Sequence, residues 1–329
     1  MTMISRRSLL AAGAAAPLVI SDAAGERPAS GPVDLAGTSI LITGCSSGFG
    51  YLGALHYARA GATVVATMRN LPRPEADRLQ ANAAKESLRL YVAEIDVLDE
   101  ASVSQGVEEA RRLIGDVPDV LVNNAGIAIV GPLEAQDIAA TRLAYETNVF
   151  GYQRTIRAIL PAMRKRGRGH IVNMSSQSGR LIWPGLGHYC PTKFAVEAMS
   201  DTLAYELAGQ GVDVTCVQPG SYPTGLWDNR ERLTKALKDR SDPAHLEGYG
   251  AMSADMGSGR VTTPPGDPQE VVAAIAQAIA APPGDRPLRL MLGHWGNPQA
   301  PINNVSRDVH LDFLGKGHFG EAARQVHKA

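Results

Sequence analysis

A tyrosine and a lysine, Tyr189 and Lys193, stand four residues apart in the segment YCPTK. Side chains at i and i+4 share one face of a helix, so this spacing predicts a phenol and an ammonium that project together. A phenol titrates near pH ~10, and a neighbouring cation favours the phenolate and lowers that pKa. For the phenol to exchange its proton at neutral pH, its pKa must fall by roughly two to three units. This corresponds to about 3–4 kcal/mol of preferential stabilisation of the phenolate. An isolated pair of this kind is more often an ordinary surface tyrosine and lysine, so the other motifs decide the interpretation.

A glycine-rich turn, TGCSSGFG, covers residues 43–50 directly after a short apolar segment. Glycines at such a point let the backbone turn tightly and approach a pyrophosphate, which then binds the free N–H groups of a helix N-terminus. The turn alone is equally consistent with a tight strand–helix connection that binds no ligand. Whether the turn indicates a ligand site therefore depends on the strands and helices around it.

Those elements alternate between apolar, β-branched segments and helical stretches. A helix is predicted at residues 49–59, and six strands are predicted at 38–43, 62–67, 88–95, 119–122, 170–174 and 212–217, with a seventh at 288–292. Alternation of this kind predicts an α/β fold with a doubly wound parallel sheet covered on both faces. Ligands of such folds bind beyond the carboxyl ends of the strands, where the polar motifs of this chain fall.

Composition excludes several classes of function. A net charge of −1 over 329 residues offers no electrostatic reason to expect nucleic acid or anionic lipid as a partner. The three cysteines, Cys45, Cys190 and Cys216, are too scattered for a disulfide framework or a zinc site, and we expect small buried residues there. No metal site is predicted.

The N-terminus differs from the rest of the chain. Arg6 and Arg7 precede an apolar, alanine-rich run that ends near Ile20, well short of the ~20 residues of a membrane-spanning helix. Residues 1–23 therefore resemble a twin-arginine export signal, which predicts a periplasmic protein with no stable membrane span. The alternative is a cytoplasmic protein with an alanine-rich tail. Residues 24–36 are predicted to be a linker and 37–329 the folded domain.

Taken in order along the chain, the motifs resemble those of the short-chain dehydrogenase/reductase family, with a leaning toward its retinol- and steroid-dehydrogenase-like branch. The matching positions are the turn T-G-x-x-x-G-x-G, Asn123-Asn124-Ala125-Gly126, Asn148, Ser176, Tyr189, Lys193 and Pro219-Gly220. The resemblance covers about residues 35–224 and implies one Rossmann-type, NAD(P)-binding catalytic domain. Family members often form dimers or tetramers, so a homodimer or homotetramer is expected by analogy.

The resemblance also implies roles for four residues. Tyr189 would be the general acid–base, and Lys193 would lower its pKa and contact the nicotinamide ribose. Ser176 would hold the substrate oxygen, and Asn148 would support the lysine through a bound water. The implied reaction interconverts a secondary alcohol and a ketone or aldehyde of a small molecule. A catalytically silent NADP(H)-binding regulatory protein is the alternative.

Cofactor contacts are implied at residues spread over the strand ends. They are Thr43, Gly44, Ser46, Ser47, Gly48, Gly50, Arg69, Asp96, Val97, Asn123, Ala125, Gly126, Tyr189, Lys193, Pro219, Gly220 and Thr224. Met68 occupies the position where the family's NAD-selective acid usually stands, Arg69 follows it, and the next carboxylate is Glu75. An arginine at this place can pair with a 2′-phosphate, so NADP(H) is favoured over NAD(H).

Two further expectations concern local structure. Pro191 is acceptable only in a first helical turn, so a helix is predicted to begin at about residues 188–190. The resemblance also implies that residues 221–263 form a lid over the substrate, which fits their loop-rich composition. Their apolar residues would equally suit a short helix at Leu226–Leu237.

Overall fold

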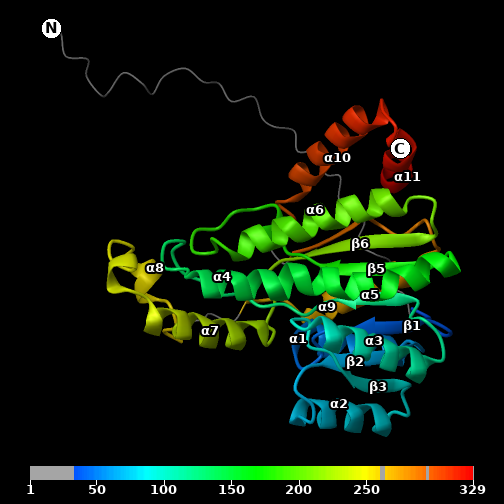
Figure 1. Cartoon of the computed structure of the whole chain (residues 1–329), viewed down its shortest axis with the longest axis horizontal. Helices are drawn as coiled ribbons and strands as arrows, with labels where there is room; N and C mark the ends of the chain where they lie inside the picture. Colours follow the sequence, from blue (N-terminus) through cyan, green and yellow to red (C-terminus); the bar gives the residue numbers. More distant parts are fainter. Residues whose placement is uncertain (1–32, 260–263, 294–295, 329) are drawn as a thin grey trace.

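The computed structural model describes residues 33–259, 264–293 and 296–328, and its centre is a seven-stranded parallel sheet (Figure 1). The strand order is β3-β2-β1-β4-β5-β6-β7. The strands are β1 Ser39–Ile42, β2 Thr63–Met68, β3 Leu90–Glu94, β4 Val120–Asn123, β5 Gly169–Met174, β6 Val212–Pro219 and β7 Arg289–Leu292. The predicted doubly wound fold is confirmed, and every predicted strand is present with shifts of at most a few residues at its ends.

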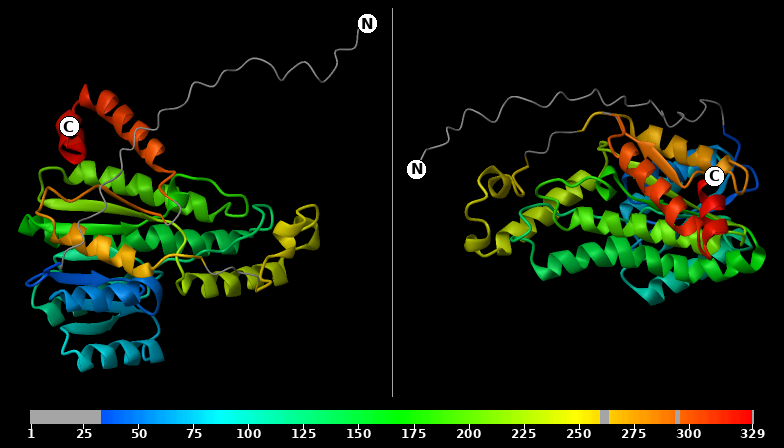
Figure 2. Two further views of the ribbon diagram at one scale, coloured as in Figure 1. Left: turned by 180° about the vertical axis from the view of Figure 1, so that it is seen from behind. Right: turned by 90° about the horizontal axis from the view of Figure 1, so that it is seen from above.

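Helices cover both faces of the sheet, as the two views of Figure 2 show. One face carries α1 Gly48–Arg59, α2 Pro74–Lys85 and α9 Pro268–Ala280, and the other carries α3 Glu100–Ile114, α5 Gly151–Arg166 and α6 Tyr189–Leu207. The central strands β1, β4 and β5 are buried along their whole length. Strands buried on both sides are apolar throughout, which is why the sequence shows continuous rather than alternating hydrophobic segments.

Residues 138–166, in the chain between β4 and β5, form one nearly continuous helical rod. The first part is α4 Ile138–Tyr145, then come one π-helical turn, η1 Glu146–Phe150, and α5. A π-turn inserts an extra residue into the helix, and such turns often occur at functional sites. The turn contains Asn148, and no sequence pattern predicted it.

The predicted lid is mostly helical rather than loop. It contains α7 Leu226–Arg240, the short 3-10 turn η3 Pro243–His245 and α8 Ala251–Ala254, and α7 and α8 extend beyond the end of the sheet (Figure 1). Residues 260–263, the end of that predicted lid, lie outside the described residues. The helix expected at Leu226–Leu237 is therefore present and one turn longer.

The remaining elements complete the C-terminal half. A 3-10 turn, η2 Gln177–Gly179, follows β5, and two helices, α10 Ala300–Gly315 and α11 Gly320–His327, close the chain beside α6 (Figure 1).

The folded body begins slightly earlier than predicted. Leu35, placed in the linker by sequence, is only 1% exposed, and its backbone N–H donates to the carbonyl of Ala60. The predicted export signal and most of the linker lie outside the described residues. Within the described ranges, no helix is both long and apolar enough to cross a bilayer. The three cysteines are free and buried, as predicted.

Candidate active site

A cleft of about 910 Å³ opens at the carboxyl ends of the strands. The sheet order reverses between β1 and β4, because β2 and β3 lie on one side of β1 and the later strands on the other. Loops that leave neighbouring strands in opposite directions create a crevice at this point. The loops after β1 to β6 and the start of α7 all contribute lining residues.

The glycine-rich turn forms one wall of the cleft. Gly44 and Gly48 have positive φ angles of 73° and 58°, which favour glycine. A Cβ on Gly50 would lie 2.5 Å from both the Gly44 carbonyl oxygen and Asn124 Nδ2, so a side chain would force the turn apart. Ser47 precedes α1 without a capping hydrogen bond from its side chain. The free N–H groups of α1 therefore face a cleft lined by small residues, which fits a diphosphate.

Two of the predicted cofactor contacts lie behind this wall. Thr43 is buried, and its Oγ1 accepts hydrogen bonds from the N–H groups of Asn124 and Ala125 at 3.0 and 3.1 Å. Asn123 is also buried, and its Nδ2 donates to Asn173 Oδ1 at 2.9 Å. Both side chains join adjacent strands, so they hold the cleft wall in place without lining the cleft.

The candidate catalytic residues meet at the opposite wall. Helix α6 begins at Tyr189, which places Pro191 third in the helix and confirms the predicted start. Lys193 Nζ lies 5.8 Å from the centre of the Tyr189 ring and donates to the Met174 carbonyl at 2.8 Å. The Ser176 hydroxyl is hydrogen bonded to the Tyr189 side chain. The three predicted side chains are therefore together in the cleft.

The titration of the pair differs from the expectation. Burial raises the pKa of Tyr189 to about 12, and the hydrogen bond from Ser176 opposes that rise only in part. Burial lowers the pKa of Lys193 to about 8, against the opposing effects of Cys216 and Glu197. The net shift of the Tyr189 pKa is therefore upward, and the predicted lowering of that pKa by Lys193 stays a prediction. Removal from water is the largest cause of both shifts, because it disfavours the charged form of each side chain.

Asn148 connects two walls of the cleft. Its Oδ1 accepts from the N–H of Ile127 at 2.8 Å, and its Nδ2 donates to the Ile127 carbonyl at 2.9 Å and to Thr192 Oγ1 at 3.1 Å. Its partners in the described part of the chain thus do not include Lys193. The π-turn directs Asn148 between the loop after β4 and the first turn of α6, where it positions both. The predicted link to Lys193 through a water stays a prediction.

Comparison with known proteins agrees with this geometry. The family described as short chain dehydrogenase matches residues 38–234. This chain is a short-chain dehydrogenase. Among curated relatives, retinol dehydrogenase 8 from Homo sapiens is 36% identical over 251 residues, 74% of this chain and 78% of the relative. The mitochondrial D-beta-hydroxybutyrate dehydrogenase from Rattus norvegicus is 32% identical, with 74% of each chain covered. The dehydrogenase belongs to the retinol- and steroid-dehydrogenase-like branch of its family.

Solved structures agree on the fold. A short-chain dehydrogenase from Streptomyces avermitilis superposes with a TM-score of 0.66 at 33% identity, covering 85% of this chain and 97% of that one. A gluconate 5-dehydrogenase from Burkholderia cenocepacia, solved with NADP and tartrate, has a TM-score of 0.56 at 29% identity, covering 63% and 81%. The dehydrogenase is therefore an NAD(P)-dependent oxidoreductase by family.

Most of the predicted site residues line the cleft of the dehydrogenase. Those that line it are Gly44, Ser46, Ser47, Gly48, Arg69, Asp96, Val97, Ala125, Gly126, Ser176, Tyr189, Lys193, Pro219, Gly220 and Thr224. Those that do not are Thr43, Gly50, Asn123 and Asn148, which support its walls from behind.

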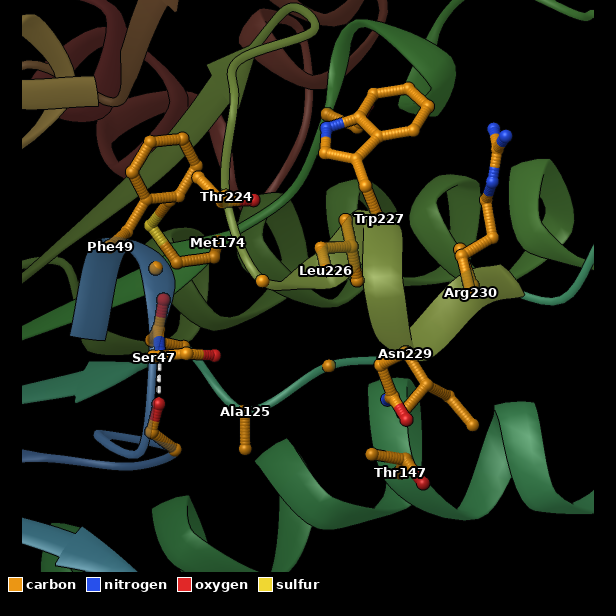
Figure 3. Close-up of a pocket in the computed structure, with 18 of the residues that line it drawn as sticks. Ser47, Phe49, Ala125, Thr147, Met174, Thr224, Leu226, Trp227, Asn229 and Arg230 are labelled. Carbon is orange, nitrogen blue, oxygen red and sulfur yellow. Dashed lines mark hydrogen bonds between the residues drawn. The ribbon is translucent and has the colours of Figure 1, made fainter. Parts of the chain in front are cut away.

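The sequence also missed several residues that line the cleft of the dehydrogenase. Arg73 lies beside Arg69 at the end of β2 and pairs with Glu75, at 2.8 Å between Nε and Oε2. Trp227 and Arg230 reach the cleft from α7 (Figure 3). The spacing of Trp227 and Arg230 on one helix could have suggested a shared face, but no pattern showed that this face turns toward the cleft.

Proposed function

We propose that this dehydrogenase interconverts a secondary alcohol and a ketone or aldehyde, uses NADP(H) in preference to NAD(H), and employs Tyr189 as its proton donor and acceptor. The observation that supports this most directly is the meeting of Ser176, Tyr189 and Lys193 in one cleft whose other wall is a glycine turn at a helix N-terminus. A nicotinamide cofactor bound there would supply or accept the hydride.

The protein's own residues would manage the proton. With a pKa of about 12, Tyr189 keeps its phenolic proton at neutral pH and can donate it to a carbonyl oxygen as negative charge develops there. Ser176, hydrogen bonded to Tyr189, would orient that oxygen and stabilise its developing charge. In the direction of alcohol oxidation the phenolic oxygen would accept the hydroxyl proton. Lys193, whose Nζ lies 5.8 Å from the centre of the Tyr189 ring, would favour the phenolate while the amine is charged.

The preference for NADP(H) rests on the end of β2. Met68 takes the position of a ribose-binding acid, while Arg69 and Arg73 both line the cleft directly after it. Glu75 also lines the cleft, but it is held by Arg73, and this contact lowers its pKa. Two guanidinium groups at this place favour a 2′-phosphate over a free 2′-hydroxyl.

The function is tested by assaying the purified protein with NADPH and NADH against a panel of ketones and aldehydes. We expect turnover with higher kcat/KM for NADPH. Tyr189→Phe should lower kcat by about 10²–10⁴-fold, the usual contribution of a general acid, and leave NADPH binding intact. Unchanged turnover by this variant would refute the role of Tyr189, and a clear preference for NADH would refute the cofactor assignment.

The silent regulatory protein remains the second candidate. A protein that binds NADPH tightly but turns over no member of the panel in either direction would support it. The joint presence of Ser176, Tyr189 and Lys193 in the cleft favours catalysis.

A further inference from the structure

An arginine of the lid helix enters the cleft on the side away from the glycine turn. Arg230 lines the cleft, is partly buried, and stacks on Trp227, with 4.4 Å between its guanidinium carbon and the centre of the indole ring. Figure 3 shows both side chains leaving α7 on the same side, whereas Asn229 points the other way, toward Thr147. Stacking on an indole holds a guanidinium in one orientation while its edge stays available for hydrogen bonds.

This guanidinium lacks the partners that neighbouring cations have. On the same helix, Lys235 pairs with Asp239 at 2.6 Å and Arg240 pairs with Asp137 at 2.6 Å. No described residue forms an ion pair with Arg230 or accepts a hydrogen bond from it, and its Nε is buried without an acceptor.

The charged groups near Arg230 do not replace such a partner. Glu231 attracts it electrostatically, but its Oε1 accepts the N–H of Gly259 at 2.5 Å. Asp228 lines the same cleft without pairing with Arg230. Burial lowers the pKa of Arg230, although a guanidinium stays charged at neutral pH. A partly buried cation with unsatisfied donors is a strong site for an anionic ligand, because the cost of desolvation is already met in the free protein.

The position of Arg230 along α7 separates it from the glycine turn, where the cofactor's diphosphate would bind. Gly225, next to the first residue of α7, approaches the glycine turn so closely that a Cβ there would lie 2.6 Å from Ser47 Oγ. Arg230 is five residues further along the helix, which is about 7.5 Å at a rise of ~1.5 Å per residue. The glycine turn, where a diphosphate would bind, therefore lies at the beginning of α7, and Arg230 lines the cleft further from that turn.

The cleft also has apolar lining residues. Its lining includes Ile127, Trp183, Leu186 and Leu226 near the candidate catalytic residues. Arg232 of α7 lines the same cleft, but it donates to Asn229 Oδ1 at 2.7 Å, whereas Arg230 has no such acceptor among the described residues. A partly apolar cleft with one unpartnered, oriented cation on this helix matches a molecule with an apolar chain and one anionic end.

We propose that Arg230 binds the carboxylate of the substrate, so that the dehydrogenase acts on hydroxy acids or keto acids with an apolar chain. This inference rests on the proposed function, because it names the substrate class of the same site. Hydride and proton transfer stay as described above, and the carboxylate takes no part in them. Its charge-assisted hydrogen bonds with the guanidinium fix the orientation of the carbonyl carbon.

The test compares keto acids of increasing chain length with their own methyl esters, which have the same ketone but no charge. We expect kcat/KM and binding to the NADP-loaded protein, measured by calorimetry, to favour the acid over the ester. Arg230→Gln should lower kcat/KM for the acid by about 10–100-fold, the usual range for a hydrogen-bonded charged pair, and leave the ester unchanged. For the acid, kcat/KM of Arg230→Lys should lie between the values of the unchanged protein and of Arg230→Gln, because lysine keeps the charge but loses the planar pair of donors.

Lys235→Gln serves as the matched control, because it removes one positive charge from the same helix at an exposed position. It should leave the preference for the acid unchanged. If Arg230→Gln lowered kcat/KM equally for acid and ester, or lowered only the affinity for NADPH, the proposal would be overturned.

The calorimetric readout separates this proposal from the proposed function. Turnover of the esters with no preference for acids would overturn the role of Arg230 and leave the oxidoreductase function standing. Binding of acids that depends on Arg230, without turnover of any carbonyl, would support the anion site and refute the proposed function.

Discussion

Tyr189 and Lys193 respond in opposite directions to the same burial. The neutral form of a phenol is its protonated form, so burial raises its pKa, to about 12 here. The neutral form of a lysine is its deprotonated form, so burial lowers its pKa, to about 8. At neutral pH both groups therefore carry their protons in the free protein, which suits donation to a carbonyl oxygen.

This titration makes a prediction at the scale of one residue. Because the folded-state pKa of Lys193 is about 8, its positive charge is present below that pH and lost above it. NADPH is an anion, so we expect its affinity for the free protein to fall as the pH is raised through about 8. Fluorescence titration at several pH values measures this. Lys193→Met should remove the step near pH 8, and an identical pH dependence in that variant would show that another group is responsible.

At the scale of elements, the turn between β1 and α1 is held to one conformation by close packing. Gly50 lies in the first turn of α1 against the Gly44 carbonyl and the side chain of Asn124, which itself donates to the carbonyls of Thr43 and Gly44 at 2.8 and 3.1 Å. The glycine is thus needed for close contact between these protein segments.

We therefore expect Gly50→Ala to lower the free energy of unfolding by about 1–3 kcal/mol, the usual cost of overpacking, and to weaken NADPH binding as the turn shifts. Urea denaturation and calorimetry measure the two effects. Gly315→Ala is the control, because its Cβ would meet only Arg324 Nη1, at 4.0 Å. Equal stability of the two variants would contradict the packing argument.

At the scale of the whole molecule, a buried polar network joins β6, β7 and α10 to α6, the helix that contains Tyr189 and Lys193. Glu197, on α6 one turn after Lys193, is fully buried and contacts Arg289 of β7 at 3.1 Å and Arg180, after η2, at 3.4 Å. It also accepts from Gln218 of β6 at 2.9 Å, and Gln218 is hydrogen bonded to Asn303 of α10. The network therefore connects the loop that carries Ser176 with α6, β7 and α10.

Removing one member of a buried charge network leaves its partners uncompensated. We expect Glu197→Gln to lower the free energy of unfolding by about 3–5 kcal/mol, although the side chain keeps its shape. Thermal or urea unfolding measures it. Glu86→Gln, which breaks an exposed pair with Arg59, should change stability little. A small effect of Glu197→Gln would show that the network is not needed to hold these elements together.

The sequence by itself determined the fold class, the strands and the motifs of the site. Continuous apolar segments, the glycine turn and the Tyr189–Lys193 spacing are local features, and local geometry converts them directly into strands, a turn and one face of a helix. The start of α6 was predictable for the same reason, because Pro191 restricts the backbone of its own neighbours.

The tertiary structure alone decided what surrounds each group. Thr43 and Asn123 look like cofactor contacts in sequence, but neighbouring strands bury them behind the cleft wall. The pKa of Tyr189 rises rather than falls, and α7 brings Arg230 into the cleft. Burial, desolvation and the absence of a partner depend on residues far apart in the chain, which meet only after folding. No spacing along the sequence encodes these properties.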